Sequence, residues 1–485
     1  MRNNGDITWR TALVWGGAMT FLTGALTWLS TRFVYGVPVA EKPIEWLVIL
    51  LAALGLLFML MAGRIVSRRI RGGNLFLLIG VGLLVRGFML ISEPMMETDF
   101  YRYLWDGAVL AQGENPYRPV PRQIVASGGW LSDLAFESGL VLERINHPEL
   151  RTIYTPIAQV FFSLSYLLAP WSLVGWRLIL LMADAITLGL LLMILHRAAL
   201  PREFALIYWL NPLVLKEISN AAHMDILLAP FILGALLLAS RRRLTLAVVC
   251  LAAATGLKIW PVLLLPLVLR AGAHGWRQAA ASACLYAALL VVMSIPVLAA
   301  GLDSSSGFTA YAGRWEMNNG PSLVPIWLGR WLAAMDWFPI SARTFSSGVL
   351  ALIVGSVALL AARRPVVGLL DLYGRALAVS ALVFLISPTQ FPWYSLWFLP
   401  LLAIRPHPAL LLYAVTLPLY YLRFRYDDLG YANLFDNGVV WLEHGPVLIL
   451  FLAAKWKPEW LASLPGSLLS VRSMDEKPGA CEVTL

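Results

Sequence analysis

The chain has 485 residues, of which 59% are hydrophobic and 13% are charged, and its mean hydropathy is +0.72. Soluble proteins are about half apolar and about a quarter charged, so this composition excludes a soluble globular protein and indicates a polytopic membrane protein. The net charge of +9 does not indicate nucleic-acid binding, because most Arg and Lys residues lie in short connections between apolar segments. Three scattered cysteines predict neither a disulfide nor a zinc site.

The first three apolar segments, at 11–31, 45–63 and 75–91, are long enough to cross the hydrocarbon core of a bilayer. The connection at 64–71 is rich in arginine, so we expect it and the N-terminus on the cytoplasmic side. Region 92–150 then lies outside. The N-terminus lacks a convincing signal-peptide cleavage site, so the first segment is expected to remain as an anchor.

A polar and aromatic passage at 92–121 follows the third segment. With Thr98 as N-cap and Gly113 as the stop signal, the passage predicts a helix that suits a membrane interface. Glu97 and Asp99 would lie at its start, where helix capping alone is one explanation for two acids. A helix of this register gathers its polar side chains within about 60° of one another: Asp99, Arg102, Tyr103 and Asp106.

The remaining segments are placed by the arginine clusters. Region 151–195 is long enough for two crossings, but the basic cluster at 241–243 requires one net crossing there. We count about 12–14 transmembrane helices in total, with a short cytoplasmic tail at 456–485. This topology puts the polar residues of several motifs on the same outer side: Asp99, His147, His223, Asp225, Lys258, Arg314 and Gln390.

The motifs as a set resemble those of GT-C-type glycosyltransferases, especially bacterial mannosyltransferases that use a polyprenol-phosphate-mannose donor. A looser similarity runs to the catalytic subunit of the first GPI mannosyltransferase. The main resemblance lies in DFYRYLWDG at 99–107 and GxNPY at 113–117. Further matches follow along the chain: INHP at 145–148, TIYTP at 152–156, WxNP at 209–212, HxD at 223–225, GLK at 256–258 and SPTQFPWY at 387–394.

This resemblance implies an all-α, GT-C-like bundle with a large first external loop that carries amphipathic interfacial helices. Its catalytic module would cover 74–455, with the external loop at 92–150, and residues 1–73 would be a two-helix extension. The expected enzyme is a hexosyltransferase of the bacterial inner membrane, and its active site faces the periplasm or exterior. It would transfer mannose from a polyprenyl-phosphate-linked donor to a hydroxyl of a glycan or glycolipid by inverting displacement.

The resemblance also implies roles for single residues. Asp99 would be the general base, and Glu97 or Asp106 would position the acceptor or a metal. Lys258, with Arg102 or Arg314, would hold the departing polyprenyl phosphate. The other candidate substrate-binding residues are Tyr103, Asn115, His147, Tyr154, His223, Asp225, Gln390 and Trp393.

Each of these roles has a simpler alternative. Lys258 interrupts an apolar run, but a lysine at a helix end also extends its ammonium to the lipid head groups. The HxD pair at 223–225 suits either a divalent cation or a polar turn, and the aromatic run at 387–394 suits either a sugar or an interfacial belt. Glu97 departs from a DxD pattern, so a need for Mg²⁺ or Mn²⁺ at Glu97 and Asp99 stays open.

Two other functions remain as alternatives. A transporter or flippase of lipid-linked saccharides would share the broken segments and intramembrane charges, but it predicts an internal repeat that the sequence does not show. A GT-C enzyme for another sugar fits the same motifs. No P-loop or dinucleotide-binding fingerprint is present, which favours a lipid-linked donor over a nucleotide sugar.

Overall fold

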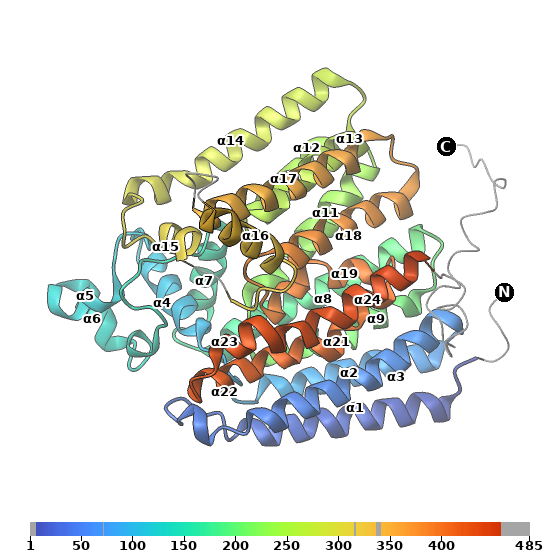
Figure 1. Ribbon diagram of the computed structural model, residues 1–485, viewed down its shortest axis with the longest axis horizontal. Helices are drawn as coiled ribbons and strands as arrows, with labels where there is room; N and C mark the ends of the chain where they lie inside the picture. The colour runs from blue at the N-terminus through green and yellow to red at the C-terminus, as the bar shows by residue number, and fades with distance from the viewer. Residues whose placement is uncertain (1–5, 71, 315–316, 336–340, 457–485) are drawn as a thin grey trace.

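The computed structural model describes residues 6–70, 72–314, 317–335 and 341–456, and these form a bundle of helices (Figure 1). In these ranges the β-structure is limited to two isolated bridges, Ile7 with Ile70 and Met317 with Thr389. The expected all-α membrane fold is therefore confirmed. Eight helical stretches are long and apolar enough to span a membrane: α1 (Trp9–Ser30), α2 (Ile44–Ser67), α3 (Gly72–Leu90), α8 (Leu173–Arg197), α14 (Trp276–Ala300), α17 (Ala342–Arg363), α18 (Gly368–Ile386) and Ala432–Ala454, which includes most of α24 (Val440–Trp456).

A ninth candidate span is bent by 108° between Pro212–Asn220 and Met224–Ser240, and its second half contains α11 (Leu228–Ser240). Several further crossings expected from the sequence fall on shorter helices, which explains why fewer full-length spans are present than the 12–14 predicted. The shorter apolar helices are α7 (Pro156–Leu168), α12 (Leu244–Thr255), Trp260–Gly272 with α13 (Leu265–Gly272), and α16 (Leu323–Ala334).

The C-terminal part of the bundle is built from short helical pieces, most of them buried, in place of continuous spans. Proline lacks a backbone donor and its ring clashes with the preceding turn, so closely spaced prolines break a helix. Region 392–422 contains Pro392, Pro400, Pro406, Pro408 and Pro418. Its pieces are Pro392–Trp397, α19 (Leu399–Leu402), α20 (Pro408–Leu411), α21 (Tyr413–Thr416), Leu417–Tyr421 and α22 (Leu422–Asp428).

The arginine-rich connections gather at one end of the bundle, which we call the arginine end. The amide of Ile70 donates to the Glu203 carboxylate at 3.4 Å, which joins the connection after α2 to the one after α8. Arg242 donates to the carbonyl of Ala273 at 2.9 Å, which joins the connections after α11 and α13. The grouping that the charge pattern predicted is therefore present in three dimensions.

The opposite end, which we call the site end, carries α4 (Asp99–Ala111), α5 (Pro121–Ser127) and α6 (Trp130–Glu137), at the left of Figure 1. The helix expected from Asp99 is confirmed, although the Thr98 side chain makes no capping hydrogen bond. At the site end α4 packs on α7, and its polar residues Arg102 and Asp106 are buried against protein. By contrast α5 and α6 leave apolar side chains exposed, among them Phe136, as interfacial helices do.

Between 151 and 195 one helix, α8, is long enough to cross a membrane. Near its start, Arg177 donates to the carbonyl oxygens of Leu90 at 2.7 Å and Ser92 at 2.9 Å, both at the site end. Its last residue, Arg197, lies at the arginine end. Only α8 in this region therefore runs from the site end to the arginine end, which is compatible with a single net crossing, and α7, which packs on α4, lies at the site end.

Candidate active site

A break in the bent helix prepares the site. Asn211 caps the first half through a hydrogen bond from the Leu213 amide at 3.0 Å, and the segment Leu215–Asn220 then winds as a π-helical turn. Such turns are rare and are frequent at functional sites. Ala222 has a φ of +62°, and His223 follows in an extended conformation before the second half begins. The break therefore changes the directions of the side chains in 215–223 relative to those in a regular helix, while these side chains stay buried.

The break is tied to the segment before α4. The Asn220 side chain accepts a hydrogen bond from the Met95 amide at 3.0 Å and donates to the Glu93 carbonyl at 2.7 Å. The Trp176 indole of α8 donates to the Ala222 carbonyl at 2.8 Å. These contacts hold the acidic segment 92–98 against the break, so that Glu97 faces the interior of the bundle.

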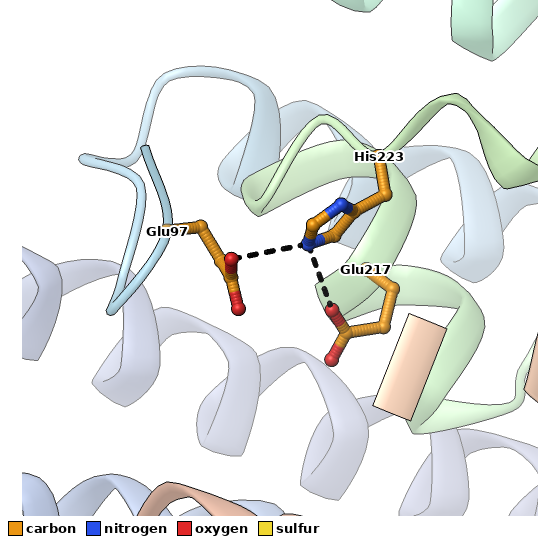
Figure 2. Close-up of side chains that lie close together, drawn as sticks. All are labelled: Glu97, Glu217 and His223. Atoms are coloured by element: carbon orange, nitrogen blue, oxygen red, sulfur yellow. Dashed lines mark ion pairs between the residues drawn. The ribbon is translucent and has the colours of Figure 1, made fainter. Parts of the chain in front are cut away.

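Four ionisable side chains meet there, and we call Glu97, Lys216, Glu217 and His223 the charge cluster. Figure 2 shows His223 between the two carboxylates. Its Nε2 lies 3.3 Å from Glu97 Oε2 and 3.8 Å from Glu217 Oε2. Lys216 Nζ lies 3.4 Å from Glu217 Oε2 and 3.8 Å from Glu97 Oε1. All four residues are buried.

The cluster balances its own charges. Unpaired charges in the interior of a bundle cost several kcal/mol, so buried ions persist only when partners surround them. Tyr421 adds a hydrogen bond from its hydroxyl to Glu217 Oε1 at 2.8 Å. Burial raises the pKa of Glu97, and the charges of His223 and Lys216 oppose that rise. A fully ionised cluster would carry two positive and two negative charges.

A second ion pair lies nearby on the other side of the break. Lys258 Nζ is 3.1 Å from Asp225 Oδ1, and the Trp397 indole donates to the same oxygen at 2.8 Å. The ammonium also sits 4.1 Å from the ring centre of Tyr394. Asp225 is buried, but the Lys258 side chain keeps 21% of its surface exposed. Lys258 is therefore a cation held at the edge of the protein interior, as an anionic ligand requires.

Aromatic rings connect the two groups of charges. The Trp393 ring stacks on the His223 ring with centroids 3.9 Å apart. The Phe391 ring also stacks on Trp393, with centroids 4.4 Å apart. Tyr394 stacks on Trp397 at 4.3 Å. Rings of this kind fix the position of His223 and offer apolar faces beside polar groups.

Asp99 is the least engaged carboxylate of the region. It is half-buried, and one hydrogen bond reaches its Oδ1, from the Asn146 side chain at 3.3 Å. The carboxylate of Asp99 also influences Tyr103. Burial is the largest cause that raises the pKa of Tyr103, and the charges of Tyr154, Asp99 and Asp225 raise it further. Among the described residues, the Asp99 carboxylate therefore takes one hydrogen bond and is not part of the charge cluster.

Asp106 lies about two helical turns after Asp99 in α4 and is buried. Gln159 donates to its Oδ2 at 3.2 Å and to the Thr152 hydroxyl at 3.1 Å. Burial raises the pKa of Asp106 to about 6, against the lowering effects of Arg102 and of hydrogen bonds from Thr152 and Gln159. This carboxyl braces α4 on α7 and does not join the charge cluster.

Several predicted substrate contacts instead hold the fold together. Arg102 donates from one nitrogen to the carbonyls of Asn146, His147 and Leu150 at 3.0–3.2 Å, which shapes the loop that carries Asn146. Asn115 donates to the Pro296 carbonyl at 2.8 Å and so ties the external region to α14. In these contacts both side chains support the loop architecture.

The remaining candidates are spread around this centre. Tyr103 and Tyr154 pack edge to face with centroids 4.8 Å apart. His147 is exposed and lies 3.5 Å from Glu149, so it is outside the charge cluster. Gln390 is buried and accepts a hydrogen bond from the Gly320 amide at 3.2 Å, a structural contact. Arg314 ends α15 (Gly307–Arg314), and its side chain lies outside the described residues.

Four residues of this region were not predicted as site residues: Lys216, Glu217, Tyr421 and Trp397. Lys216 and Glu217 lie in an apolar segment, and ionisable residues in such segments are functional candidates by default. That rule, already applied to Lys258, was the signal that could have found them. Nothing local marks Tyr421 or Trp397, because only the fold brings them beside residues about 170–200 positions earlier in the chain.

The charge cluster contains a donor set for a divalent cation. Glu97, Glu217 and His223 offer ligand atoms that lie within 4.8 Å of one another, and such oxygen and nitrogen donors suit Mn²⁺. However, the Lys216 ammonium already lies beside both carboxylates, where it neutralises them and repels a second cation. The donor atoms fit a metal, and the local charge balance does not require one.

A family model described as alpha-(1->6)-mannopyranosyltransferase, N-terminal domain, matches residues 10–274 of this chain, which is more than half of it. The matched part includes Asp99, the whole charge cluster and the ion pair of Asp225 with Lys258. No curated protein and no solved structure gives a significant match.

Proposed function

The chain belongs to this mannopyranosyltransferase family, and we propose that it transfers mannose from a polyprenyl-phosphate donor to an acceptor hydroxyl. It is a multi-pass membrane mannosyltransferase, which implies a sugar donor and a glycan acceptor. The donor class, the GT-C type and the inverting mechanism belong to the proposal. So does its location in a bacterial inner membrane with the active site facing outward.

The observation that supports the proposal most is that a half-buried carboxylate, Asp99, and a partly exposed ammonium, Lys258, both lie at the site end of the bundle. Asp99 has one hydrogen-bond donor on its carboxylate, and Lys258 is held by Asp225 with 21% of its side chain exposed. Transfer from a glycosyl phosphate needs a base for the acceptor and a positive charge for the leaving phosphate. The two side chains meet these two needs.

In the proposed reaction the acceptor oxygen attacks the anomeric carbon of mannose while Asp99 accepts the hydroxyl proton. The bond between the anomeric carbon and the phosphate oxygen breaks, and both electrons leave with the polyprenyl phosphate. Lys258 offsets the charge that grows on this phosphate. Glu97 and His223 belong to the rigid charge cluster, which holds the segment leading into Asp99.

Stereochemistry gives the proposal a sharp requirement. A single displacement inverts the configuration at the reacting carbon, so an α-linked product must come from a β-linked donor. The matching family is described by an α-linked product. We therefore expect this enzyme to use a β-mannosyl polyprenyl phosphate and to reject the α-anomer.

The experiment is turnover of labelled donors by the purified protein in lipid, with EDTA present throughout. We expect the β-mannosyl polyprenyl phosphate to be consumed, and its α-anomer, the β-glucosyl analogue and GDP-mannose to remain. Turnover in EDTA follows from Lys216, which supplies the positive charge that a metal would bring to the cluster. Consumption of GDP-mannose would overturn the donor class, and movement of intact donor between leaflets without cleavage would favour a flippase.

A further inference from the structure

A hollow at the arginine end has no part in the proposed reaction. It consists of two adjoining parts of about 360 and 570 Å³, which share Arg197, Gly368 and Leu369 in their walls. The hollow lies where α8 and α11 end and α18 begins. It is at the opposite end of the bundle from Asp99, so the two sites are separate.

The charges around this hollow are mainly positive. Within the described residues, neither Arg197 nor Arg241 forms an ion pair, and both are exposed. The acid in its wall, Asp371, is bound by Arg375, with nitrogen–oxygen distances of 2.7 and 2.8 Å. Four guanidinium groups line the hollow: Arg197, Arg241, Arg242 and Arg405.

Two further features suit an anion with an apolar part. Gly368 and Leu369 are the first residues of α18, a helix of 19 residues whose N-terminus carries a partial positive charge. The walls also contain the apolar side chains of Leu237, Val366 and Leu372 beside the arginines. A guanidinium group can donate two parallel hydrogen bonds to the oxygens of one phosphate. The leucine side chains favour contact with a hydrocarbon chain over contact with water.

We propose that this hollow binds the phosphodiester headgroup of an anionic phospholipid in the leaflet at the arginine end. Basic pockets between transmembrane helices on the cytoplasmic side bind such headgroups. A free phosphate carries the same kind of charge, but it has no apolar part to contact the apolar wall. The lipid would fill the gap between α8, α11 and α18 and lock the ends of these helices together.

The test uses the full-length protein in nanodiscs of phosphatidylcholine with increasing fractions of fluorescent phosphatidylglycerol. The variant Arg197→Gln with Arg241→Gln removes two charges from the hollow. The matched control is Arg68→Gln with Arg69→Gln, which removes two exposed charges from the connection after α2, outside the hollow. Donor turnover by each variant reports whether the fold is intact, since none of these residues belongs to the active site.

We expect wild type and the control variant to enrich phosphatidylglycerol equally, and the hollow variant to lose about tenfold in its affinity. An equal loss in both variants, or no loss in either, would overturn the proposal, because the arginines would then act only through general surface charge. Inorganic phosphate at millimolar concentration should not displace the lipid. Displacement by phosphate would show that the hollow binds a soluble anion, and it would also overturn the proposal that it binds a phospholipid.

Discussion

At the scale of single residues, Lys216 decides whether the charge cluster is stable. Its ammonium serves both Glu97 and Glu217, so Lys216→Met leaves an uncompensated negative charge in a buried place. We expect a loss of about 3–5 kcal/mol in the free energy of unfolding, measured in detergent by denaturant titration. The double variant Lys216→Met with Glu217→Gln should regain part of it, because the surplus charge is gone. A loss that is simply additive would show that the two residues do not interact.

The raised pKa of Asp106 predicts how the free energy of unfolding changes with pH. Its pKa is raised from the usual 3.8 to about 6, so the folded protein holds a proton that the unfolded chain releases. The stabilising contribution is complete below about pH 4 and is lost as pH rises to about 6, by roughly 3 kcal/mol. We expect the difference in Tm between Asp106→Asn and wild type to grow in favour of the variant across this interval. A difference that is constant with pH would contradict the account of Asp106.

Sequence reasoning at this scale found the acids but not their partners. The family resemblance implied roles for Asp99 and Lys258, and Lys258 also stood out because it interrupts an apolar run; the structure puts both at the site end. Arg102 and Asn115 were predicted to bind substrate, whereas the structure shows them bound to backbone carbonyls. A motif records which residue types recur, and it does not record whether a side chain points to a ligand or to its own chain.

At the scale of elements, the contact of α4 with α7 places Asp99. A Cβ atom added at Gly107 would overlap the carbonyl oxygen of Phe162, so the two helices approach through this glycine. We expect Gly107→Ala to destabilise the protein by about 1–3 kcal/mol and to reduce donor turnover. The matched control is Gly189→Ala in α8, where the added atom meets open space and a helical alanine is favoured by about 0.5–1 kcal/mol. If Gly107→Ala and Gly189→Ala changed the free energy of unfolding in the same direction, the close approach of α4 and α7 at Gly107 would be refuted.

Elements with strong local signals were predicted well, and elements decided by packing were not. Hydropathy located α1 to α3, and the helix start at Asp99 followed from sequence signals alone. The burial of α4 could not be predicted, because its polar residues find partners in a loop about 40 residues later. A polar turn at 223–225 was among the sequence-based expectations, and the break between Asn220 and Met224 confirms a turn there. The left-handed conformation of Ala222 within it has no sequence signature.

At the scale of the whole molecule, the two ends of the bundle should face opposite sides of the membrane. In a background without cysteine, Glu149→Cys lies at the site end, and Arg243→Cys at the arginine end; both positions are exposed. Because arginine-rich connections stay in the cytoplasm, we expect an impermeant maleimide to label position 149 in intact cells and position 243 only after permeabilisation. Labelling of both positions in intact cells would refute this orientation.

In the proposed reaction Asp99 takes the acceptor proton during mannose transfer, and a comparison of three proteins shows whether it does. Purified wild type, Asp99→Asn and the control Asp427→Asn, an exposed acid in α22, would each be given β-mannosyl polyprenyl phosphate and an acceptor. We expect the transfer rate of Asp99→Asn to fall by about 100-fold or more with normal donor binding, and that of Asp427→Asn to stay unchanged. Transfer by Asp99→Asn at half the wild-type rate or above would contradict it.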